Sequence, residues 1–89
     1  MMTAAPKVAI AWLLEKDWKV WQALDSEMPD YPRWLSKIEA GIKQAELAGG
    51  QAVKIEIDPD TFVAWCKTVG RDSRSQYAAQ ILMRRLTSH

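Results

Sequence analysis

The stretch Val53-Lys54-Ile55-Glu56-Ile57-Asp58-Pro59 alternates apolar and charged side chains and then ends at a proline. Alternation with a period of two predicts a β-strand with one face in the core and the other in solvent. The expected inward residues are Val53, Ile55 and Ile57, and the expected outward residues are Lys54 and Glu56. Asp58 before Pro59 is typical of a helix start, with the aspartate as N-cap and the proline in the first turn.

Two helices are predicted after this strand. The apolar positions of the first recur at helical spacing, and they are Phe62, Trp65, Cys66 and Val69. Gly70 is a typical helix stop, and Ser73 with Gln76 forms a capping box that opens the second helix. The C-terminal part of the chain is therefore predicted to run strand, helix, turn, helix.

The first fifty residues are predicted to form a helical hairpin. One helix is expected over Pro6–Met28, because apolar residues there recur at helical spacing. Pro29 and Pro32 break the chain, and a second helix is expected from Pro32 to Gly49. Gly41 beside the apolar stripe of that helix predicts the close approach of another helix or of a packed tryptophan.

The predicted order is α-α-β-α-α, a mainly helical fold with one short β-strand and therefore no second strand to pair with. Buried peptide groups need hydrogen-bond partners, and residues 1–5 are a poor strand. We therefore expect a homodimer in which residues 53–58 of two chains pair antiparallel, with Val53, Ile55 and Ile57 at the interface. Residues 1–50 form the hairpin and residues 51–89 the dimerisation module of one compact domain.

Composition limits the classes of function. The 89 residues carry a net charge of +1, one cysteine and one histidine, too few soft ligands for a structural zinc site. The longest apolar run, Val8–Leu14, is too short to cross a membrane and is not flanked as a secretory leader would be. The lone Cys66 on an apolar stripe favours a cytoplasmic protein. No residue cluster typical of an enzyme, a metal site or a cofactor site is found, so we expect a non-enzymatic protein without cofactors.

Five tryptophans are the unusual feature of the composition. We expect Trp21, Trp34 and Trp65 to lie in the core, because they occupy the apolar faces of the predicted helices. Trp12 falls on the opposite face with Lys16 and Lys19. Tryptophan is enriched among interface residues, so Trp12 is the candidate anchor for a partner protein or for the second copy.

Two stretches carry a resemblance to a known family. They are Val53-Lys-Ile-Glu-Ile-Asp-Pro59 and Gly70-Arg71-Asp72-Ser73-Arg74-Ser75-Gln76-Tyr77. Together they resemble the ribbon-helix-helix (Arc/MetJ-like) family of small repressors, over residues 52–86. In that family two strands form a ribbon that lies in the DNA major groove, and the second helix begins at a phosphate. The resemblance implies base-reading residues at Lys54, Glu56 and Asp58 and a phosphate clamp of Arg71, Ser73, Arg74 and Ser75.

Two functions follow from this sequence. The first is a homodimeric, ribbon-helix-helix-like regulator that binds DNA. The second is a protein–protein adaptor or inhibitor built on the same dimer without a nucleic-acid role, presenting Trp12 and its neighbours. Charge distinguishes the two functions. Phosphate contacts dominate affinity for DNA, and the outward face of the predicted strand is net negative, because it carries Glu56 and Asp58 with only Lys54.

Overall fold

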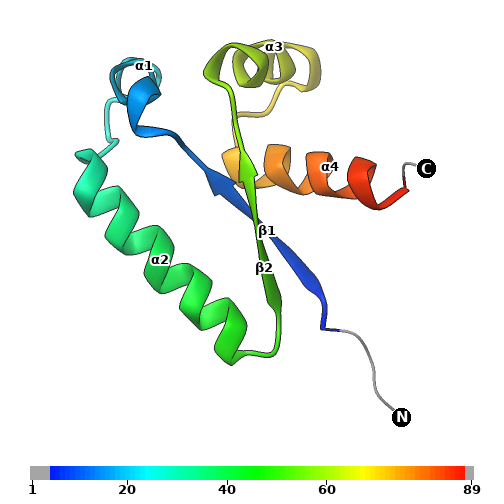
Figure 1. The fold of residues 1–89 in the computed structure, drawn as a ribbon. Coiled ribbons are helices and arrows are strands. Elements are labelled where there is room, and N and C mark those ends of the chain that lie inside the picture. Colours follow the sequence, from blue (N-terminus) through cyan, green and yellow to red (C-terminus); the bar gives the residue numbers. More distant parts are fainter. Residues whose placement is uncertain (1–4, 88–89) are drawn as a thin grey trace.

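The computed structural model describes residues 5–87 (Figure 1). The elements along the chain are β1 (Lys7–Trp12), a 3-10 turn η1 (Glu15–Asp17), α1 (Trp18–Leu24), α2 (Tyr31–Leu47), β2 (Gln51–Glu56), α3 (Pro59–Val69) and α4 (Arg74–Thr87). The two strands form one parallel sheet, in which Lys7 lies beside Gln51 and Trp12 beside Glu56. The fold is therefore mainly helical, with a small two-stranded sheet. None of the described helices has the length and apolar character that a membrane crossing needs.

The predicted helix over Pro6–Met28 is wrong. Its first part is β1, and only the seven residues of α1 and the short turn η1 are helical. A short, continuous apolar run suits a strand covered on both faces as well as it suits a buried helix, and periodicity alone does not separate the two. The element order α-α-β-α-α is corrected accordingly: the chain begins with a strand.

The prediction that the strand has no partner within the chain is also wrong. β1 pairs with β2 along the whole length of both strands, and the pairing is parallel rather than antiparallel. The connection through α1 and α2 makes this a β-α-β unit, which is the usual way to join two parallel strands. Residues from the first and second halves of the chain therefore share one sheet.

The helices cover the two faces of the sheet. Figure 1 shows α2 on one side of the strands and α4 on the other. Because side chains alternate along a strand, Ala11 and Ile55 share one face, and Trp12 and Lys54 share the other. The second face meets α2, since the rings of Trp12 and Trp34 lie 5.6 Å apart. The first face meets α4, which packs mainly against β1.

The core is built largely from aromatic and aliphatic side chains. Trp21, Leu13, Ile55 and Ile57 are almost completely inaccessible to solvent. Trp18, Trp34 and Trp65 are also buried, which confirms the expected core positions of Trp21, Trp34 and Trp65.

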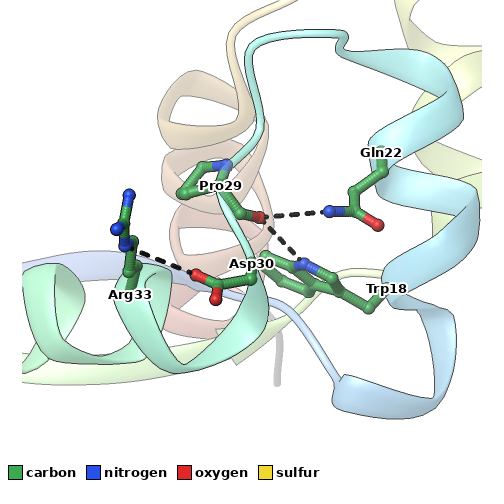
Figure 2. Close-up of polar contacts among 5 residues, drawn as sticks. All are labelled: Trp18, Gln22, Pro29, Asp30 and Arg33. Carbon is green, nitrogen blue, oxygen red and sulfur yellow. Dashed lines mark hydrogen bonds and ion pairs between the residues drawn. The ribbon is translucent and has the colours of Figure 1, made fainter.

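The turn between α1 and α2 is fixed by two side chains of α1 (Figure 2). The indole N–H of Trp18 donates to the carbonyl oxygen of Pro29 at 3.0 Å, and the amide of Gln22 donates to the same oxygen at 3.4 Å. At the start of α2, Arg33 and Asp30 form an exposed ion pair at 3.9 Å. The two bonds to Pro29 therefore tie the segment that precedes α2 to the side of α1.

The caps and stops of the later helices are confirmed. The Asp58 carboxylate accepts from the backbone N–H of Thr61 at 3.0 Å, and Pro59 opens α3. Gly70 ends α3 in the left-handed conformation, with φ of 69°. The Ser73 hydroxyl accepts from the backbone N–H of Gln76 at 3.2 Å, which is one half of the predicted capping box; the Gln76 side-chain oxygen accepts from Arg71 instead. The close approach expected at Gly41 is not found, because no described atom outside its own helix lies within 4 Å of where a Cβ would be.

Candidate nucleic-acid and dimer interface

The two faces of β2 differ as the alternating sequence predicts. Ile55 and Ile57 are buried and Val53 is half-buried, whereas Lys54 and Glu56 are exposed. Asp58 is exposed as well, but its carboxylate is engaged at the start of α3. The residues expected at a dimer interface thus lie on the core face, and those expected to read bases lie on the opposite face.

The hydrogen-bond pattern of the sheet leaves one edge of β2 open. The backbone N–H of Gln51 donates to Pro6 and that of Ile57 donates to Trp12, at 2.8 and 3.1 Å. In a parallel ladder, residues that bond to the neighbouring strand alternate with residues whose peptide groups point away from it. The outward peptide groups of β2 are therefore those of Ala52, Lys54 and Glu56. Their N–H groups have no hydrogen-bond partner among the described residues.

The prediction that Trp12 shares the outer face of a helix with Lys16 and Lys19 is wrong, because Trp12 lies on β1 and is half-buried against the core. Its ring packs on Trp34, and the Lys54 ammonium lies 4.2 Å from the ring centroid. A cation in this position is attracted by the electron-rich face of the indole. Trp12 therefore links β1, α2 and the outward cation of β2.

The predicted phosphate clamp gathers at the start of α4. Ser73 caps the helix, Ser75 is exposed beside it, and the Arg71 guanidinium donates to the Gln76 side chain at 3.3 Å. Arg74 is half-buried and pairs with Asp25, with 3.4 Å between Nη1 and Oδ2. The four clamp residues form one local group, as expected from their closeness in the chain.

A pocket of about 340 Å³ lies at this turn. Its lining residues come from β1, α2, the end of α1 and the start of α4, and they are Ala11, Asp25, Trp34, Ile38, Asp72, Ser73, Arg74 and Ser75. Lys54 and Glu56 do not line it. The clamp and the outward residues of β2 are therefore two separate groups of side chains in one protomer.

Asp25 is the site residue that sequence reasoning missed. It lies 49 positions from Arg74 in the chain and follows the last residue of α1. No local pattern relates positions so far apart, and only the packing of the whole chain brings the end of α1 beside the start of α4.

The single cysteine lies close to the same turn. Burial raises the pKa of the Cys66 thiol, and the nearby Asp72 carboxylate raises it further. A thiol with a raised pKa stays protonated at neutral pH and is a poor nucleophile. Cys66 therefore fits the structural role that its apolar stripe predicts.

Comparison with family models, curated proteins and solved structures found no match to this chain. Its function is therefore inferred from its own residues.

Proposed function

We propose that this protein is a small, cytoplasmic, non-enzymatic regulator that acts as a homodimer and binds DNA through the strand-helix-helix unit of residues 51–87. The observation that carries the proposal is the geometry of β2. Its apolar side chains Ile55 and Ile57 are buried, Lys54 and Glu56 are exposed, and the peptide N–H groups at its outer edge have no hydrogen-bond partner among the described residues. The resemblance to the ribbon-helix-helix family implies that such a strand pairs with a second copy, and β2 differs from that family in having β1 as a further neighbour within the chain.

Charge selects one register for this pairing. In an antiparallel pair about a two-fold axis, residues with outward peptide groups must face each other. If Ile55 lies on the axis, Lys54 of one chain faces Glu56 of the second copy, and Val53 faces Ile57. A shift by one residue toward the N-terminus in each chain would place two Lys54 side chains opposite each other, which is unfavourable. The favoured register leaves β1 on the outside of a four-stranded sheet.

The start of α4 supports DNA as the ligand. Ser73, Ser75 and the guanidinium groups of Arg71 and Arg74 lie at a helix N-terminus, where backbone N–H groups and the helix dipole favour an anion. Arg84 and Arg85 add positive charge along the same helix. Phosphate contacts of this kind supply most of the affinity of a protein for DNA.

Salt dependence of binding tests this proposal. We expect the protein to bind a fluorescein-labelled, mixed-sequence duplex, with an affinity that falls steeply as salt rises. Arg71→Ala should weaken binding and lower the slope of log K against log salt by about one for each phosphate that Arg71 neutralises. Lys43→Ala, which removes an exposed cation on α2 outside residues 51–87, is the matched control and should change neither the affinity nor the slope. Absence of binding at low salt would rule out the DNA proposal.

A protein–protein adaptor is the second candidate, and a specific observation favours it. α2 and Trp12 lie on the same side of the sheet as Lys54, and in the favoured register Lys54 and Glu56 neutralise each other across the dimer. A neutral face beside a helix suits a protein partner better than a phosphate backbone. A dimer that binds no DNA at low salt would favour this function.

A further inference from the structure

The contact between Arg74 and Asp25 joins two segments that are far apart in the chain. The Arg74 guanidinium lies 3.4 Å from the Asp25 carboxylate, with 29% and 38% of the two side chains exposed. Arg74 begins α4, and Asp25 caps the end of α1. One arginine of the predicted clamp is therefore already paired with an anion in the free protein.

The Asp25 carboxylate is held in position by its own turn. Its Oδ1 accepts from the backbone N–H of Glu27 at 3.0 Å, while Oδ2 faces Arg74. The backbone N–H of Asp25 donates to the carbonyl of Trp21 at 2.9 Å. A carboxylate fixed in this way loses little further freedom when it pairs with a guanidinium, which favours the contact although it is partly exposed.

A carboxylate and a phosphate make the same kind of contact with a guanidinium. Both accept charge-assisted hydrogen bonds from its planar N–H groups. Asp25 also lines the pocket at the start of α4 together with Ser73 and Ser75, two further residues of the predicted clamp. The Asp25 carboxylate therefore lies where the resemblance implies a DNA phosphate.

We propose that the Asp25 carboxylate is an internal competitor of the DNA phosphate, and that it lowers the affinity of the free protein for DNA by pairing with Arg74. This inference rests on the proposed DNA-binding function. Binding then exchanges one anion for another at Arg74, and the pair opens without any change in the fold of α4. The first half of the chain thereby regulates the clamp of the second half.

Asp25→Asn tests the inference with little change in structure. The asparagine oxygen can still accept from Glu27, but the side chain no longer neutralises Arg74. We expect the variant to bind the labelled duplex about two- to fivefold more tightly than wild type, as the removal of a partly exposed ion pair predicts. The slope of log K against log salt should stay close to that of wild type, because Arg74 contacts a phosphate in both proteins. Asp30→Asn makes the same change in net charge at the start of α2 and is the matched control.

The dependence of this gain on Arg74 distinguishes competition from a general charge effect. The double variant Asp25→Asn/Arg74→Ala should bind the duplex no more tightly than Arg74→Ala alone, because the gain from Asp25→Asn requires Arg74. If wild type binds and Asp25→Asn gains no more than Asp30→Asn, the competition is ruled out and the DNA function stands. If neither wild type nor Asp25→Asn binds at low salt, both proposals fail.

Discussion

Among single residues, Asp58 makes a clear contribution to stability. Its carboxylate accepts the Thr61 N–H at the start of α3, and its carbonyl accepts from the Thr61 hydroxyl at 3.1 Å. We expect Asp58→Ala to lower the free energy of unfolding by about 1 kcal/mol, the usual contribution of an N-cap. Asp58→Asn retains an acceptor and should reduce it much less. Urea unfolding of the three proteins measures this, and equal midpoints for all of them would contradict the role of the cap.

The residues that could be predicted from the sequence act over short distances along the chain. The cap at Asp58, the stop at Gly70 and the capping residue Ser73 each depend on neighbours within a few positions. The pairing of Asp25 with Arg74 depends on the packing of the whole chain. Local patterns therefore predicted the helix boundaries around Ser73 and Arg74 and missed the carboxylate that contacts Arg74.

At the scale of elements, substitution of two helix glycines by alanine should change the stability of the protein in opposite directions. Gly41 lies inside α2 with nothing near its missing Cβ, so Gly41→Ala should stabilise the protein by about 0.5–1 kcal/mol. Gly70 ends α3 with φ of 69°, so Gly70→Ala should destabilise it by about 1–2 kcal/mol. Thermal unfolding of the two variants beside wild type measures both effects. A shift of the same sign in both would show that one of the two backbone conformations is wrong.

The elements that could be predicted are those with sequence boundaries at both ends. α3 begins at Asp58-Pro59 and ends at Gly70, and α2 lies between a proline and two glycines. β1 lacks such boundaries and overlaps the apolar run Val8–Leu14, where each residue suits either a helix or a strand covered on both faces. Pairing with β2 and cover from helices on both sides favour the strand, and both are long-range effects.

For the whole molecule, the outer edge of β2 is the feature on which the proposed function depends. A two-stranded sheet has two edges, and exposed edges readily accept further strands. β1 takes one edge of β2, and the proposed second copy takes the other. The sequence predicted a dimer because the strand had no partner within the chain. The structure gives β2 a partner, β1, and the dimer is now proposed because the outer edge of β2 has peptide groups without hydrogen bonds among the described residues.

Amide hydrogen exchange at Lys54 tests this central proposal most directly. Its N–H points to the outer edge of β2, and the N–H of Ala9 points to the outer edge of β1, so Ala9 is the internal control. We predict that the Lys54 amide is protected at high protein concentration and becomes unprotected on dilution, while Ala9 does not change. Lys54→Pro removes the outward donor and should yield particles of the 10.1 kDa chain mass rather than twice that mass. Exchange at Lys54 that is fast at every concentration would contradict the dimer.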